Sequence, residues 1–299
     1  MAQNLGSHAL PGFYHDTDGA AAHNTREGMP CGMDPQTESA AMIEECLPLI
    51  RALGVGRHAI AIGGSRGKGV ADRRSDYDFR LYCDEIRGGV DYEQTPAWVE
   101  FAEAVERWRA QGLVIDHVWM RTFAEIDAAL QPWLGGLIQP VDLLWTLWGY
   151  HLLPDLYHQQ IIEDPFGLAA AWKARLRVYP PTLKQALVTK HLGSLRYWRS
   201  DYHYANKVAR GDAVFLAGMA ARLVHDLMQV LFALNETYYV GDGNNLDFAG
   251  EFALLPPDFP QRVELALYPP ATEDRFVQQR LTLVGLIGDV ERLAADVPS

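Results

Sequence analysis

Two aspartates one residue apart follow a glycine-rich segment in the stretch GGSRGKGVADRRSDYD, residues 63–78. In SDYDFRLYCD, the apolar side chains of Tyr77, Phe79 and Leu81 alternate with polar ones, Asp76 and Asp78 among them. This period of two predicts a strand that buries one face and presents both carboxylates on the other. Carboxylates are typical ligands of Mg²⁺, but an isolated pair is more typical of a solvated strand face. The residues that precede the pair therefore decide its interpretation.

The glycine-rich segment allows three phosphate-binding interpretations, which differ in spacing. A Walker loop requires glycine at position 62 and serine or threonine at 69, where the chain has Ile62 and Gly69. A dinucleotide fingerprint beginning at Gly67 requires a small residue at 72, where the chain has Asp72. The third pattern is a strand ending in Gly-Ser, a further glycine, and Ser-Asp-x-Asp on the next strand. Residues 62–79 fit this third pattern without a gap.

On these residues the chain resembles the polymerase-beta-like nucleotidyltransferase superfamily. The matching positions are Gly64 and Ser65 at the end of the first strand, Gly69 four residues later, and Ser75 directly before the aspartates. Within the superfamily the chain is most similar to two-domain antibiotic nucleotidyltransferases that act on aminoglycosides or lincosamides. The resemblance implies an α+β protein, with an N-terminal nucleotidyltransferase α/β domain built on a mixed sheet and a C-terminal all-α domain.

The chemistry of nucleotidyl transfer requires such residues. Two carboxylates on one strand face can hold one or two Mg²⁺ ions, which bridge triphosphate oxygens and neutralise charge during in-line displacement. Backbone N–H groups and a serine hydroxyl can cradle the β and γ phosphates where glycine lets the backbone approach. We expect Asp76 and Asp78 to bind metal, and we expect the NTP to contact Gly64, Ser65, Arg66, Lys68, Ser75 and Lys190.

A third carboxylate is expected on a neighbouring strand, and Asp116 in LVIDHVWM is the best candidate. It interrupts an apolar run, where a charge is costly unless it meets a cation or points into a cleft. The resemblance implies an acidic residue at about this place. Asp116 is expected either to complete the metal site or to take the proton from the attacking hydroxyl.

The elements that must position these residues follow from periodicity. Residues 37–53 and 97–112 have apolar side chains at helical spacing, and residues 58–64, 75–84 and 113–120 have the character of strands. This order predicts an α/β domain over residues 37–139, preceded by a polar extension over residues 1–36.

Beyond residue 139 long helical patterns predominate, and we expect a helical domain over residues 140–299. The sequence RGD at 210–212, followed by a long apolar run into LNETYYVGDGNN, resembles the helical domain of unknown function that often follows such nucleotidyltransferase domains. Lys190, Arg196 and Lys207 are candidates to reach the triphosphate from this domain, although each is more typical of a solvated surface charge.

The composition and net charge of the chain indicate which partners and which surroundings are favoured. A net charge of −12 disfavours a nucleic-acid partner and makes a cationic acceptor electrostatically easier to bind. Three widely spaced cysteines favour a reducing cytoplasm over a disulfide framework. The chain contains no uninterrupted apolar run of about 20 residues, which is the length that a membrane-spanning helix requires.

The sequence therefore predicts a cytoplasmic, Mg²⁺-dependent enzyme that transfers a nucleoside monophosphate, with ATP the favoured donor, to a hydroxyl of a small molecule. One alternative is transfer of AMP to a partner protein, as in toxin-antitoxin relatives, whose catalytic modules are usually shorter than this chain. A second alternative is a nucleotide-sensing protein without turnover. The sequence does not specify the acceptor or the oligomeric state.

Overall fold

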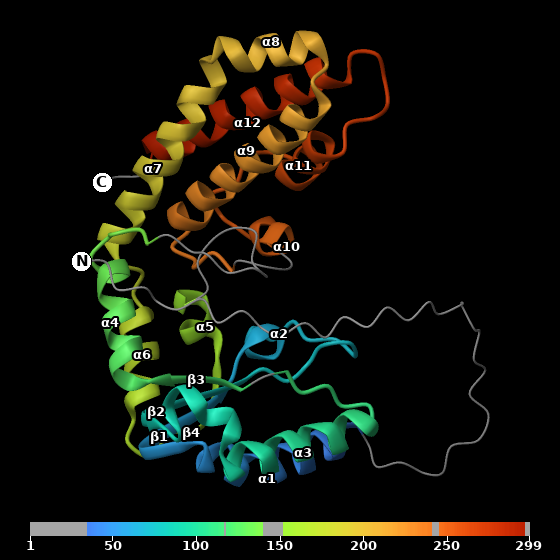
Figure 1. The fold of residues 1–299 in the computed structure, drawn as a ribbon. Coiled ribbons are helices and arrows are strands. Elements are labelled where there is room, and N and C mark those ends of the chain that lie inside the picture. The colour runs from blue at the N-terminus through green and yellow to red at the C-terminus, as the bar shows by residue number, and fades with distance from the viewer. Residues whose placement is uncertain (1–34, 117, 140–151, 241–244, 297–299) are drawn as a thin grey trace, which may run out of the picture.

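The computed structural model of the protein describes residues 35–116, 118–139, 152–240 and 245–296. A small sheet with its covering helices lies at one end of the molecule, and a group of longer helices lies at the other (Figure 1). The structure is thus mixed α/β with a four-stranded mixed sheet, in agreement with the expected α+β class.

The sheet contains β1 (Gly54–Ile62), β2 (Phe79–Ile86), β3 (Trp119–Thr122) and β4 (Gln160–Glu163) in the order β3-β2-β1-β4. β1 is antiparallel to β2 and β4, whereas β2 and β3 are parallel. β1 and β2 are joined through the glycine-rich segment, which contains the four-residue helix α2 (Gly64–Gly67). The segment turns the chain back, so that β1 and β2 pair along their length.

One face of the sheet packs on α1 (Pro35–Ala52) and α3 (Pro96–Ala110), with η1 (Gly89–Gln94) leading into α3. Their shared core includes Ile50, Ile60, Phe79, Leu81 and Phe101, each at most 2% exposed. β2 therefore buries the side that the sequence predicts, but its other side is buried as well, since Arg80 and Tyr82 are 3% and 2% exposed. This core fixes the strand that follows the aspartates.

The opposite face of the sheet packs on α4 (Phe123–Leu134) and α6 (Leu168–Leu176). Tyr82 meets the Trp172 ring edge-on at 5.0 Å, and Phe123 lies against the same ring at 5.7 Å. α5 (Leu152–His158) connects this layer to β4. The apolar cluster on this side continues without a break into the helical region.

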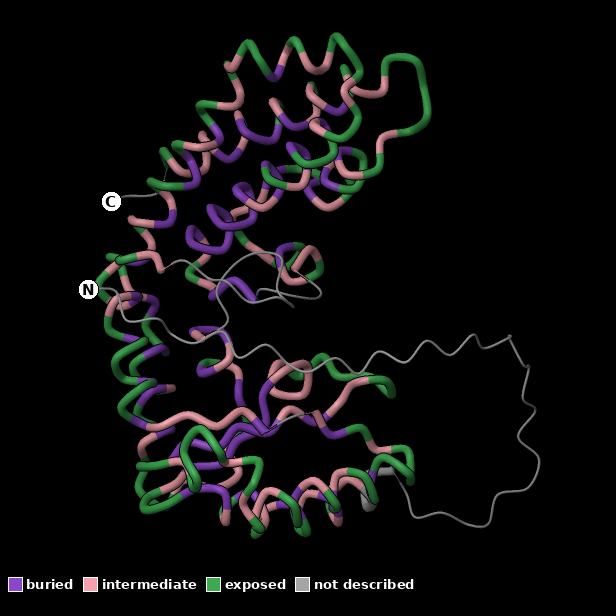
Figure 2. The backbone as a smooth tube through the Cα atoms, in the orientation of Figure 1, coloured by how far each residue is buried: buried purple, intermediate pink, exposed green. Residues whose placement is uncertain are grey.

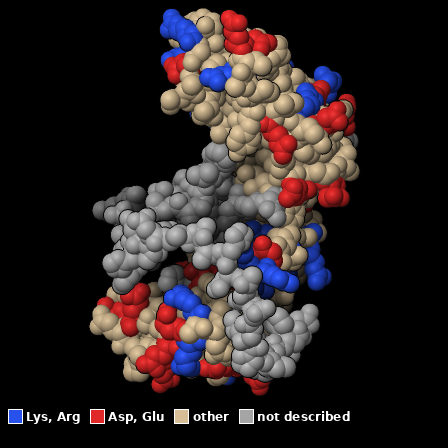
Figure 3. Space-filling model, turned by 90° about the vertical axis from the view of Figure 1, so that its right-hand side faces the viewer, with Lys and Arg blue, Asp and Glu red and all other residues tan. Residues whose placement is uncertain are grey.

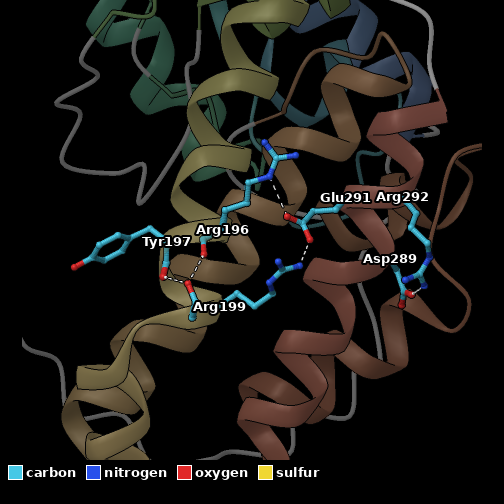
Figure 4. Close-up of polar contacts among 7 residues, drawn as sticks. Arg196, Tyr197, Arg199, Asp289, Glu291 and Arg292 are labelled. Carbon is cyan, nitrogen blue, oxygen red and sulfur yellow. Dashed lines mark hydrogen bonds and ion pairs between the residues drawn. The ribbon is translucent and has the colours of Figure 1, made fainter.

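The helical region is built around α9 (Ala213–Leu234), which packs on α7 (Pro181–Ser200), α11 (Phe259–Leu267) and α12 (Arg275–Asp296). Buried backbone concentrates along α9, as Figure 2 shows. α8 (Tyr202–Arg210) and α10 (Asn245–Gly250) complete the region. Arg196 and Arg199 of α7 both bind Glu291 of α12, so a shared carboxylate joins these helices (Figure 4).

Helix α9 is the one helix among the described residues that is long and apolar enough to cross a membrane. Of its apolar window, 61% is buried inside the protein. The helix therefore has the burial of a core helix of a soluble protein, not of a lipid-facing span.

The structure differs from the sequence-based expectations in three places. β2 begins at Phe79 and β3 at Trp119, so the strands start after the aspartates that we placed on them. β4 lies beyond residue 139, where we expected strands to end, because four residues are too short to give a clear periodicity. The expected extension over residues 1–36 falls almost wholly outside the described residues. The expected domain boundary at 139–140 lies at the end of a described range, because residues 140–151 are outside the described residues.

Candidate active site

The carboxylates of Asp76, Asp78 and Asp116 form one cluster, in which one oxygen from each lies within 4.8 Å of the others. A single parallel bridge between Tyr77 and Ile115 produces this arrangement. Tyr77 N–H donates to the Val114 carbonyl at 2.9 Å, and Asp116 N–H donates to the Tyr77 carbonyl at 3.1 Å. Because neighbouring residues of extended chain point to opposite faces, burying Tyr77 and Ile115 turns all three carboxylates the other way.

Asp78 lies directly against the glycine-rich segment. Gly64 has a φ of +59°, and a Cβ added to it would lie 1.7 Å from Asp78 Oδ2. The neighbouring Gly63 N–H donates to the Asp78 backbone carbonyl at 2.9 Å. Glycine at 64 is therefore required both by the left-handed backbone and by the carboxylate that occupies the space of a side chain.

The environment of Asp78 favours its neutral form. Burial raises the pKa of its carboxyl from the ordinary 3.8 to about 6; the nearby Arg80 opposes this rise, and the carboxylates of Asp76, Asp116 and Asp155 add to it. Crowding of carboxylates in a half-buried place is unfavourable until a cation offsets it. The cluster is thus poised to exchange a proton for a metal ion.

Arg80 forms a buried ion pair that sequence reasoning missed. Its Nε and Nη2 atoms lie 2.8 and 3.1 Å from the two carboxylate oxygens of Asp155 on α5, and its Nη1 lies 3.8 Å from Asp78 Oδ1. The Arg80 and Asp155 side chains are only 3% and 9% exposed. The position of Arg80 on the polar side of β2 was a usable signal, whereas nothing in the local pattern marks Asp155.

Arg66 fastens the glycine-rich segment to the carboxylates. Its Nε donates to the Asp76 carbonyl at 2.8 Å, its Nη2 donates to the Ser75 carbonyl at 2.7 Å, and its guanidinium lies 3.7 Å from the Tyr77 ring centre. Arg66 was expected to contact phosphate, but in this structure its donors hold the backbone that carries Asp76. The spacing of residues in the sequence does not predict this contact of Arg66, because its acceptors are backbone carbonyls.

Ser75 likewise makes an internal contact. Its hydroxyl donates to Asp72 Oδ1 at 3.0 Å and accepts from the Asp72 backbone N–H at 2.9 Å. This reciprocal pair closes the turn before the aspartates. The hydroxyl that the motif suggests as a phosphate ligand is therefore occupied in shaping the segment.

Lys68 and Gly64 line a cleft between the glycine-rich segment and α5. The cleft is completed from the second half of the chain by Pro154, Asp155, His158, Gln159 and Val240. Burial and, to a smaller extent, the nearby charge of Lys68 lower the pKa of His158 to about 4. His158 is therefore neutral at pH 7, and Lys68 carries the positive charge of this cleft.

The other expected cations lie elsewhere among the described residues. Lys190 is exposed on α7, where its charge acts on His225 of α9. Arg196 binds Glu291 at 3.0 Å, and Lys207 of α8 binds Asp212 at 2.6 Å. On the face in Figure 3, Lys and Arg are interspersed with Asp and Glu. The structure thus brings Gly64 against the Asp78 carboxylate and Arg66 against the backbone of Asp76, and it places Lys68 in the adjoining cleft, whereas Lys190 lies on α7.

The donor set of the cluster fits Mg²⁺. Three carboxylate oxygens are hard ligands, and oxygens of an octahedral site at about 2.1 Å from the ion lie roughly 3 to 4.2 Å apart. The separations within 4.8 Å require only a small contraction on binding. Asp76, Asp78 and Asp116 are thus the residues that would hold the ion.

Comparison with protein families matches a part of the chain. Residues 145–242 match the family model described as a domain of unknown function, DUF4037. The matched segment includes α5, β4 and the helices α6 to α9. No curated protein matches the chain. The description of this family names no activity, so the site is the basis for assigning a function.

Proposed function

We propose that this protein is a Mg²⁺-dependent nucleotidyltransferase of the polymerase-beta-like type. It transfers a nucleoside monophosphate, preferably AMP from ATP, to a hydroxyl of a small, cationic acceptor and releases pyrophosphate. The buried free thiols of Cys46 and Cys83 are consistent with a cytoplasmic enzyme.

One observation carries this proposal: the three carboxylates meet within 4.8 Å of one another, and one of them touches the glycine of the Gly-Ser motif. A solvated strand face would leave Asp76 and Asp78 apart from the glycine-rich segment. The site instead combines an anionic metal cradle with an adjoining cleft that contains Lys68. A triphosphate requires both features, and an isolated metal site requires only the first.

Each residue then has a definite role. Asp76 and Asp78 hold the ion, which when bound offsets the negative charge of the phosphates. Asp116 takes the proton of the acceptor hydroxyl or supplies the third ligand. Lys68 binds phosphate oxygens, and backbone N–H groups of the glycine-rich segment donate to them.

Pyrophosphate release tests the proposal. The purified chain is incubated with Mg²⁺, each of the four NTPs and a panel of aminoglycoside-like and lincosamide-like acceptors. We expect acceptor-dependent release with at least one NTP, and a loss of about 100-fold or more in Asp76→Asn and Asp78→Asn, because each removes a charged ligand.

Asp91→Asn is the matched control, since Asp91 is an exposed aspartate on η1 and should leave the rate unchanged. Equal rates in Asp78→Asn and Asp91→Asn would refute the metal assignment. Tight binding of NTP and Mg²⁺ without turnover would instead support the nucleotide-sensing alternative.

A further inference from the structure

A second cluster of metal-binding side chains lies in the helical region, on α7 and α9. His191, His225 and Asp226 each offer one ligand atom, and these atoms lie within 4.8 Å of one another. His191 and Asp226 are 6% and 5% exposed, and His225 is half-buried. None of these residues belongs to the carboxylate cluster.

Hydrogen bonds fix the cluster. His191 Nδ1 lies 2.6 Å from Asp226 Oδ1, and the Ser194 hydroxyl donates to Asp226 Oδ2 at 2.7 Å. A buried carboxylate held by an imidazole and a hydroxyl is stabilised best when a full positive charge is also present.

The two imidazoles are placed as if to share one ion. Their ring centres are 5.5 Å apart, with the planes at 82°. With nitrogen about 2.0–2.1 Å from a tetrahedral Zn²⁺, two imidazole centres would lie about 5.2 Å apart. The observed separation is close to this value, so the two rings lie at a distance at which they can share one ion.

From this geometry we propose that His191, His225 and Asp226 form a second metal site, of the Zn²⁺ class, between α7 and α9. Two imidazoles and one carboxylate favour Zn²⁺ over Mg²⁺, which prefers oxygen ligands alone. Lys190 and Arg222 lie nearby but are exposed, and solvent screens their charges.

The site ties together the two helices that pack most extensively in the helical region. The His225 ring also meets the Tyr239 ring edge-on at 5.8 Å, next to Val240 of the cleft at the glycine-rich segment. A bound ion would therefore fix both the α7–α9 packing and the segment that leads to this cleft. This role does not depend on the proposed nucleotidyl transfer.

The test is metal titration of the full chain after treatment with a chelator. The starting protein carries Asp76→Asn and Asp78→Asn, which disable the carboxylate cluster, and His8→Ala, His15→Ala and His23→Ala, which remove histidines of the N-terminal stretch. We expect one equivalent of Zn²⁺ or Co²⁺ to bind, with the visible absorption of tetrahedral Co²⁺ and a raised melting temperature.

His225→Ala is the decisive variant because it leaves the His191–Asp226 contact in place, and circular dichroism checks that it folds. We expect its Co²⁺ affinity to fall at least about 10-fold and the visible absorption to disappear. His203→Ala, an exposed histidine on α8, is the control and should bind like the starting protein. Binding of no equivalent by the starting protein, or equal affinity in His225→Ala, would overturn the proposal.

Discussion

Replacing Gly64 by alanine should disable the site through one contact. The new Cβ would lie 1.7 Å from Asp78 Oδ2, whereas ordinary contacts begin at 3.4 Å. The carboxylate or the glycine-rich segment must therefore move by well over 1 Å. A misplacement of about 1 Å at a reacting group costs on the order of 100-fold in rate.

Gly69→Ala provides a matched control. Gly69 also has a positive φ, of +75°, but an added Cβ would meet nothing within 4 Å. Both variants place alanine in the left-handed region, which costs about 1–2 kcal/mol of folding free energy. They differ in the contact with Asp78, so a comparison isolates its effect from backbone strain.

The assay pairs urea unfolding with Mg²⁺ titration calorimetry and pyrophosphate release. We expect similar losses of stability in both variants, but a large loss of Mg²⁺ affinity and rate in Gly64→Ala alone. Equal Mg²⁺ affinity in Gly64→Ala and Gly69→Ala would show that the Asp78 carboxylate does not need its position against the glycine. The reasoning from the close contact would then be wrong.

Four further predictions concern the surroundings of the carboxylates. Burial raises the pKa of Asp78 to about 6, and only the ionised carboxylate binds the metal. The Mg²⁺ affinity should therefore be constant above pH 7 and should fall below pH 6 by up to about tenfold per pH unit. Calorimetry at several pH values would measure this dependence. Without metal, the raised pKa of the Asp78 carboxyl stabilises the fold fully below pH 3.8, and this contribution to stability is lost as the pH rises through about 6. Asp78→Asn should therefore melt at a higher temperature than the parent at pH 7.5 in chelator. An unchanged melting temperature would contradict this prediction. Arg66→Met should lower unfolding free energy by about 2 kcal/mol, because two hydrogen bonds from a charged donor are lost, and should reduce pyrophosphate release although Arg66 then touches no substrate. Asp155→Asn leaves Arg80 buried without its partner and should cost about 3–5 kcal/mol in urea unfolding, whereas Asp84→Asn, at an exposed arginine pair, should cost far less; similar losses would refute the role of burial.

The sequence predicted those parts of the site that depend on local pattern. The alternation around Tyr77 indicated correctly that this side chain is buried and that Asp76 and Asp78 share the other side. Helix α12 (Arg275–Asp296) lies in the region that the sequence predicts to be helical. Asp212 caps α9, since its side chain accepts the Phe215 N–H at 3.3 Å. These features depend on residues a few positions apart, so period and capping chemistry are sufficient.

Residue roles were harder to predict where a side chain had two available partners. Arg66 was expected on phosphate because it is a cation in a glycine-rich segment, yet the Ser75 and Asp76 carbonyls take its donors. Ser75 was expected on phosphate by motif, but it pairs with Asp72. Spacing shows which groups are available, whereas competition among nearby acceptors decides which contacts form.

The sequence alone thus determined which functional groups are available for chemistry. These are a glycine-rich segment, two aspartates on one side of an extended chain, and a third aspartate whose place in the fold the sequence leaves open. Only the tertiary structure decided that Asp116 meets the pair and that Asp155, 75 residues beyond Arg80, closes the site from α5. The physical reason is that these contacts are long-range. They depend on how sheet and helices pack, and packing leaves no period in the local sequence.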